Sequence, residues 1–168
     1  MQTRKIRSLR GDCRGSALVE GAVLMPLLFT LLFGVYDFSW LFFQQHLIST
    51  GVRDAARYLA RSPNGCDAAS ALWDAEEAAA RRLAVTGAIN GIAPRVKGWT
   101  AAMVSIGCTP IDNAVAPDGL RTYRGADVIH VVTVSTRFAD PSLGFFRFLG
   151  LQSPSISGTH SERVIGPG

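Results

Sequence analysis

The stretch Gly15–Phe43 constrains the fold of this chain more strongly than any other. Between Glu20 and Asp37 it contains no charged residue and no polar face. A membrane span needs roughly 20 predominantly apolar residues, and the stretch reaches that length if it continues through Phe38–Phe43. A soluble helix at the surface of a core, the alternative, would keep a polar face. The stretch therefore predicts a single transmembrane helix in contact with the lipid bilayer.

The residues before this stretch predict its orientation. Residues 1–15 form a basic leader that carries Arg4, Lys5, Arg7, Arg10, Arg14 and Asp12. Because a Lys/Arg excess marks the cytoplasmic side, we expect a single-pass protein of the cytoplasmic (inner) membrane with its C-terminal part periplasmic. The leader accounts for the whole net charge of +4, so the exported part is neutral and its charge gives no argument for nucleic-acid binding. The alternative is an ordinary cleaved signal peptide, which has a shorter apolar core followed by a small-residue cleavage site. Here the apolar run is longer, and Trp40-Leu-Phe-Phe43 follows it where small residues would be needed.

Glu20 lies at the edge of the predicted span, where a carboxylate is costly and usually functional. It comes five residues after Gly15, which itself follows the basic leader. This arrangement resembles the type IV prepilin processing site, where a membrane peptidase cuts after the glycine. The resemblance implies cleavage between Gly15 and Ser16 by a prepilin peptidase. It also implies that Glu20 sets helix register by pairing with a terminal amine in a filament. A Glu20 that reaches the membrane surface without processing is the alternative.

Downstream residues extend the resemblance. The relevant segments are Glu20-Gly-Ala-Val-Leu-Met-Pro-Leu-Leu28, Gly34-Val-Tyr-Asp-Phe38, Gln44-Gln45 and Ala55-Ala-Arg-Tyr58. Together they resemble the TadE-like family, the pseudopilins of the tight-adherence (Tad/Flp) pilus machinery. Gly21 departs from that family, which usually has an aromatic or bulky residue there. The resemblance implies a minor pilin needed for pilus assembly or initiation. Its implied partners are other pilins or pseudopilins and the inner-membrane assembly platform.

The pattern becomes amphipathic after Gln44. Its apolar face contains Ile48, Val52, Ala55, Ala56 and Leu59, and its polar face has a basic stripe of Arg53, Arg57 and Arg61. Asp54 is expected to offset Arg57. The stripe is either a solvated face or a contact with acidic residues of neighbouring subunits. Asp37, near the outer membrane boundary, either reaches water or pairs with a basic residue of another subunit, as a second register contact.

No proline separates the span from the amphipathic segment, so residues 16–61 are expected to form one helix, about 65 Å long at 1.5 Å per residue. Residues 62–168 are predicted to form the exported domain. It should contain a second helix over 68–86, capped by Asp67, with a buried face of Leu72, Ala75, Ala79 and Leu83. Alternating patterns predict strands over 100–107, 127–138 and 156–165, with a loop over 110–125. The predicted fold class is α+β and type IV pilin-like, with a small antiparallel sheet.

The apolar segment 143–151, with Phe145–Leu149 at its centre, has two interpretations. It is either a lid over the sheet or a patch that faces the membrane or another subunit. The two exported cysteines, Cys66 and Cys108, suggest a disulfide in an oxidising compartment, with free buried thiols as the alternative.

Recognisable catalytic chemistry is missing from the sequence pattern. The three histidines are far apart, and the chain has no H-E-x-x-H, G-x-S-x-G, C-x-x-C or P-loop motif. We therefore expect no enzyme, no cofactor and no metal site. The alternative to a minor pilin is an unprocessed, membrane-anchored periplasmic binding or scaffold domain.

Overall fold

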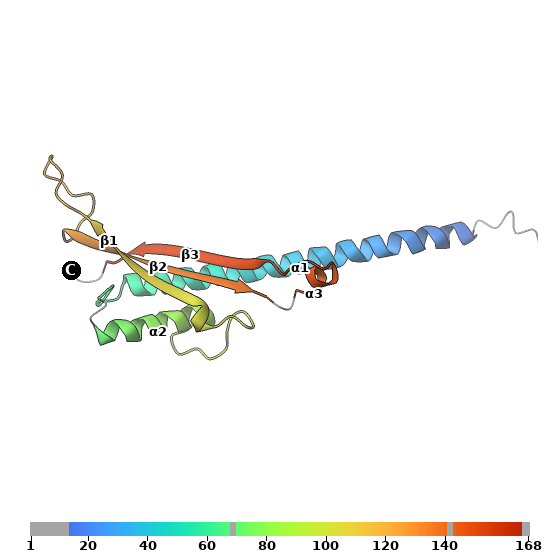
Figure 1. Ribbon diagram of the computed structural model, residues 1–168, viewed down its shortest axis with the longest axis horizontal. Helices are drawn as coiled ribbons and strands as arrows, with labels where there is room; N and C mark the ends of the chain where they lie inside the picture. Colours follow the sequence, from blue (N-terminus) through green and yellow to red (C-terminus); the bar gives the residue numbers. More distant parts are fainter. Residues whose placement is uncertain (1–13, 68–69, 141–142, 166–168) are drawn as a thin grey trace, which may run out of the picture. The chain divides into compact units, whose positions relative to one another are not determined.

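The computed structural model describes residues 14–67, 70–140 and 143–165 (Figure 1). The basic leader lies outside the described residues, apart from Arg14 and Gly15. The elements are α1 (Arg14–Ala60), α2 (Ala71–Thr86), a 3-10 turn (Ala101–Met103), β1 (Val104–Asp112), β2 (Val128–Ala139), α3 (Gly144–Phe148) and β3 (Ser155–Arg163). A long apolar N-terminal helix, a second helix and a three-stranded antiparallel sheet confirm the predicted α+β, pilin-like fold.

The chain divides into two compact units, and the division falls within α1, between Ser39 and Trp40. In the first unit the helix is apolar around its circumference, and two of its hydroxyl groups bond to backbone carbonyl oxygens of the same helix. Thr30 Oγ1 donates to the Pro26 carbonyl oxygen at 2.8 Å, and Ser39 Oγ donates to the Val35 carbonyl oxygen at 2.7 Å. The most apolar 18-residue window of α1 has a mean hydropathy of 2.1 and none of it is buried. These features indicate single-pass membrane anchoring by α1.

The second unit is organised around the amphipathic part of α1. Its predicted apolar face is confirmed, because Ile48, Val52, Ala55, Ala56 and Leu59 are all at most 1% exposed. The sheet has the order β1-β2-β3 with antiparallel pairing throughout. Alternate residues of the central strand join the same core, among them Val132, Val134 and Phe138.

Helix α2 starts later and is rotated relative to the prediction. Its N-cap is Ser70, whose Oγ accepts from the Leu72 backbone N–H at 3.3 Å, in place of the predicted Asp67. Leu72 is 63% exposed, whereas Trp73, Ala79, Ala80, Ala84 and Val85 are buried. Of the predicted buried face, only Ala79 was placed correctly. The large apolar surface of Trp73 accounts for the difference. Burying this side chain rotates the buried face of α2 by about one residue relative to the predicted face.

The strands agree with the prediction except at β1, which starts at Val104 and runs to Asp112. The predicted strand ended at residue 107, and the predicted loop began at Pro110. Pro110 is tolerated inside the strand because β1 is an edge strand, where one side needs no backbone donor. It pairs in register with His130 of β2.

The lid interpretation of the apolar segment is wrong for its C-terminal part. Leu143 is buried, but Phe148 is 82% exposed, Leu149 47% and Leu151 55%. Helix α3 has only five residues, so it has little more than one turn with which to bury side chains. Most of this segment is therefore left facing outward.

Gly51 lets α1 and α2 approach closely. A Cβ atom at this position would lie 2.3 Å from the Ala84 carbonyl oxygen and 3.0 Å from the Trp99 ring. We expect Gly51→Ala to lower the free energy of unfolding by roughly 1–3 kcal/mol through overpacking, although alanine is the better helix former by about 1 kcal/mol. Thermal unfolding of the purified protein measures the change.

Gly107→Ala is the control for this prediction, because nothing lies within 4 Å of the Cβ position at Gly107. Its melting temperature should stay close to that of the wild type. A Gly51→Ala variant as stable as the Gly107→Ala variant would contradict the close approach of the two helices.

Candidate functional site

The predicted processing site lies in the first turns of α1. Gly15, Ser16 and Glu20 are exposed there, and they border one shallow depression of the helix surface together with Val19 and Val23. The Gly15–Ser16 bond and the Glu20 carboxylate therefore share a face, one helical turn apart. Within the described residues Glu20 makes no hydrogen bond or ion pair. Its carboxylate is thus available to a group from outside that part of the chain.

Asp37 lies further along the same helix, three residues before Trp40. Asp37 is buried and already takes part in an interaction within the chain. Asp37 therefore already has a partner before any neighbouring subunit could bind. A register role for Asp37 stays a prediction.

The basic stripe is exposed along the second half of α1, as Arg53, Arg57 and Arg61 all face outward. Arg57 Nε lies 3.6 Å from Glu162 Oε1, and the same oxygen lies 2.9 Å from His160 Nε2. The hydrogen bond with His160, reinforced by the charge of Arg57, lowers the pKa of Glu162 below its usual range. The positive charge of Arg57 is therefore partly offset by Glu162 within the chain.

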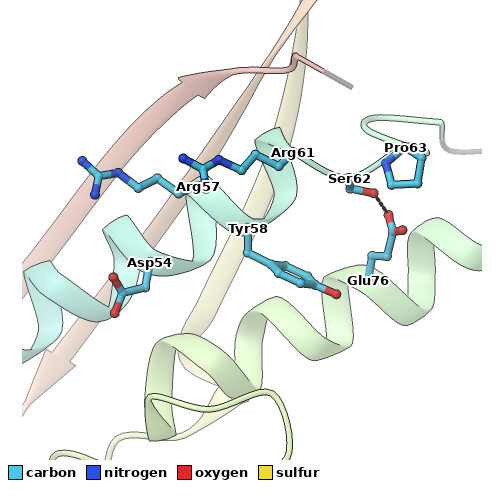
Figure 2. A pocket seen from close by; sticks show the side chains of 7 residues that line it. All are labelled: Asp54, Arg57, Tyr58, Arg61, Ser62, Pro63 and Glu76. Atoms are coloured by element: carbon cyan, nitrogen blue, oxygen red, sulfur yellow. Dashed lines mark hydrogen bonds between the residues drawn. The ribbon is translucent and has the colours of Figure 1, made fainter. Parts of the chain in front are cut away.

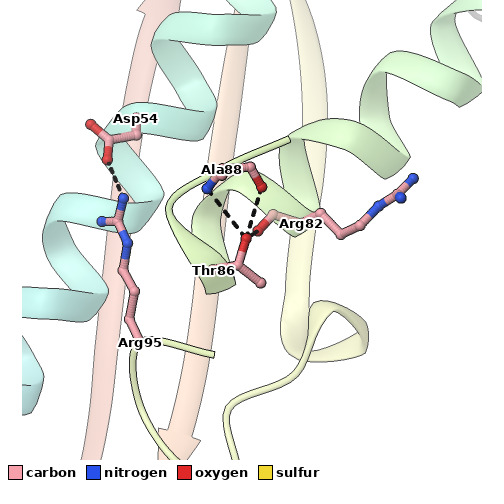
Figure 3. Close-up of polar contacts among 5 residues, drawn as sticks. All are labelled: Asp54, Arg82, Thr86, Ala88 and Arg95. Carbon is pink, nitrogen blue, oxygen red and sulfur yellow. Dashed lines mark hydrogen bonds and ion pairs between the residues drawn. The ribbon is translucent and has the colours of Figure 1, made fainter. Parts of the chain in front are cut away.

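Asp54 does not offset Arg57, contrary to the prediction. It pairs with Arg95, whose Nη2 lies 2.9 Å from Asp54 Oδ2 (Figure 3). Arg95 is held in place because its backbone N–H donates to the Val85 carbonyl oxygen at 2.7 Å.

Gly87 leaves room for the Arg95 guanidinium. It has a φ of 84°, and a Cβ there would come within 2.7 Å of that group. Just before it, Thr86 Oγ1 bonds the Arg82 and Ala88 carbonyl oxygens at 2.8 Å and completes the end of α2 (Figure 3). The end of α2 thus positions Arg95 beside Asp54 of α1. The spacing of residues within α1 alone could not predict this ion pair.

A groove of about 430 Å³ lies where α1 ends, lined by Asp54, Arg57, Tyr58, Arg61, Ser62, Pro63 and Glu76. Figure 2 shows Arg57 and Arg61 extending along one side of α1, while Tyr58 leaves the helix toward α2. Ser62 Oγ and Asn64 Nδ2 both donate to the Glu76 carboxylate, the latter at 3.2 Å. The Glu76 carboxylate is occupied by these two bonds. Its role in the groove is therefore to hold the turn between α1 and α2.

The structure joins Cys66 to Cys108 by a disulfide with an S–S distance of 2.04 Å across 42 residues of sequence. The bond connects the α1–α2 turn to the edge strand β1. Cys66 has a φ of 66°, a positive value for a residue other than glycine.

Sequence reasoning missed several buried polar contacts, two of which lie around the sheet. Asn113, 2% exposed, donates through Nδ2 to the Tyr123 and Ala126 carbonyl oxygens at 2.9 and 3.0 Å and accepts from the Tyr123 N–H at 3.0 Å. Asn113 thereby holds the β1–β2 loop together. The only signal of this role in the sequence is the asparagine itself, a residue type that often bonds to the backbone of turns. Trp99 Nε1 donates to Thr136 Oγ1 at 3.0 Å. Among the residues that the structure describes, no group of three or more His, Cys, Asp or Glu side chains is placed to hold a metal ion.

These features define the class as a pilin-like α+β protein whose N-terminal helix is long and apolar enough to cross a membrane. The family model for TadE-like protein matches residues 15–57. This match confirms the resemblance to the TadE-like family and indicates involvement in the Tad pilus. It includes the predicted processing site, Glu20 and Asp37, but not Arg61 or the disulfide. Comparison with curated proteins and with solved structures gives no match.

Proposed function

We propose that the protein is a minor pilin, or pseudopilin, needed for assembly or initiation of the Tad pilus, and that it acts by assembly and not by catalysis. The observation that carries the proposal is the exposed Gly15–Ser16 bond one turn before Glu20, at the start of a long apolar helix. The match to the TadE-like family over the same residues supports it.

The proposed mechanism starts with removal of residues 1–15 by a prepilin peptidase, which leaves a new amine on Ser16. The helix then packs beside other pilin helices in the bilayer at the assembly platform. An ionised carboxylate without a partner is costly in a low-dielectric environment, while removal of one partner from a buried pair is strongly destabilising. Glu20 therefore favours the alignment in which it meets a terminal amine, and disfavours other registers.

Processing is tested by a bulky residue at the cleavage site. We expect Gly15→Leu to keep its leader, because the prepilin processing site that this segment resembles has a glycine before the cut. Mass spectrometry of the membrane fraction should find the variant heavier than the wild type by the mass of residues 1–15. A wild-type chain that keeps residues 1–15 in cells with the peptidase would leave an unprocessed anchored scaffold as the better account.

Register is tested separately by Glu20→Ala. The cut site is intact in this variant, so we expect Ser16 at its N-terminus but a large loss of protein from the assembled pilus fraction. Val19→Ala is the matched control, since it changes an exposed neighbour without removing the acid. Normal assembly of Glu20→Ala would exclude the register role while leaving the processing result untouched.

The orientation is a further part of the proposal, because it rests on the Lys/Arg excess of the leader. A reporter that is active only outside the cytoplasm, fused after Gly168, should be active. A reporter that works only in the cytoplasm should be silent at the same position. The opposite pattern would reverse the topology.

A further inference from the structure

An apolar foot, defined as Gly144–Leu151, extends from the second unit. It has three strongly exposed apolar side chains, those of Phe148, Leu149 and Leu151, with exposed fractions of 82%, 47% and 55%. Arg147 is exposed as well, and the segment contains no acidic residue. Side chains of this size in one short segment form the kind of surface that marks a contact with a membrane or a partner.

The chain segments before and after the foot are each bonded to α1, at the neighbouring residues Gln44 and Gln45. Before the foot, Gln44 Nε2 donates to Asp140 Oδ2, and both side chains are buried, each residue being 3% exposed. After it, Gln45 Nε2 donates to the Ser157 carbonyl oxygen at 3.2 Å. Figure 1 shows α3 at the end of the sheet where β2 finishes and β3 begins. The foot is therefore held at the level of Gln44 and Gln45.

The segment of α1 just before this level is aromatic. Trp40, Phe42 and Phe43 are 43%, 69% and 52% exposed, and the rings of Trp40 and Phe43 lie 5.7 Å apart. Tryptophan concentrates at membrane–water interfaces. From Trp40 to Gln44 the helix rises only about 6 Å. If Trp40 marks the outer boundary of the bilayer, the foot lies about one helical turn from it.

We propose that the apolar foot is an interfacial membrane anchor, with Phe148, Leu149 and Leu151 inserted at the level of the lipid headgroups and Arg147 close to lipid phosphates. The proposal rests on the membrane span in α1. The bilayer is the occupant favoured here, because the segments around the foot are tied to α1 at Gln44 and Gln45, directly after the exposed aromatic residues Trp40–Phe43, and because the foot carries a cation without any acid. Side chains that bury apolar surface next to a cation suit an anionic lipid surface.

The test uses the full chain in vesicles of phosphatidylcholine and phosphatidylglycerol. An environment-sensitive fluorophore is attached to Phe148→Cys in a Cys13→Ser background. The matched control carries the same label on Leu120→Cys, a 67% exposed apolar residue in the β1–β2 loop. We expect a blue-shifted emission at position 148 and several-fold stronger quenching by nitroxide-bearing lipids than at position 120.

Two results would overturn the proposal. Equal, weak quenching at positions 148 and 120 would show that the foot stays in water. A shielded label at position 148 that becomes exposed when the protein is diluted in lipid would show that a second copy of the chain covers the foot. A label on Phe29→Cys tests the span by itself, so a failure of membrane anchoring is distinguishable from a failure of the foot.

Discussion

Replacing Cys66 and Cys108 together by serine is expected to lower the free energy of unfolding of the second unit by about 4 kcal/mol. The bond closes a loop across 42 residues, and cross-linking a loop of that length restricts the unfolded chain by about this amount. Cys108 is exposed and Cys66 is half-buried, so the serine hydroxyls can reach water. The loss should therefore come from the missing cross-link and not from a buried polar group.

Urea unfolding in detergent measures this effect through the fluorescence of Trp73 and Trp99, which are 4% and 1% exposed. Wild-type protein treated with reductant should unfold at the same urea concentration as the double variant. Cys13→Ser alone should leave the transition unchanged, because it removes a cysteine outside the disulfide. Two alkylatable thiols at Cys66 and Cys108 in exported protein would contradict the bond itself.

The fold class could be predicted from the sequence because the apolar residues of the helices and of the strands recur with different periods. The apolar face of α1 from Ile48 to Leu59 follows helical spacing and is buried as predicted. Strand β2 was placed within about one residue by its β-branched alternation. Rotation of α2 was missed because counting apolar positions treats Leu72 and Trp73 alike, whereas the larger side chain decides which face is buried.

The polar contacts could not be predicted, because their partners are distant in sequence. Gln44 and Asp140 are 96 residues apart, and Asp54 and Arg95 are 41 apart. Helical spacing suggested Arg57 as the partner of Asp54, but the end of α2 brings in Arg95 instead. The geometry of the predicted processing site is a different case, because Ser16 and Glu20 are four residues apart in one helix and this spacing alone places them on one face. Cleavage there stays a prediction. Local spacing therefore shows which residues of one element share a face, but not which partners other elements bring to that face.

Replacing Trp99 by alanine is expected to destabilise the second unit by about 3–5 kcal/mol, the usual cost of deleting a large buried aromatic side chain. Trp99 is 1% exposed, and its ring lies against α1, where Gly51 leaves space for it. Its Nε1 donates to Thr136 Oγ1 at 3.0 Å, and Thr136 Oγ1 donates onward to the Met103 carbonyl oxygen at 2.8 Å. The loss therefore combines a cavity with a broken hydrogen-bond chain.

Thr136→Val separates these two contributions. Valine keeps the shape of threonine but leaves the Trp99 N–H and the Met103 carbonyl oxygen without their buried partner, which should cost about 1–3 kcal/mol. Trp99→Phe removes the donor and keeps most of the ring. In a double-mutant cycle, the combined variant should then lose less than the sum of the two single losses, because one bond cannot be broken twice. Strictly additive losses in urea unfolding would show that the Trp99–Thr136 hydrogen bond contributes nothing to stability, and that Trp99 acts through packing alone.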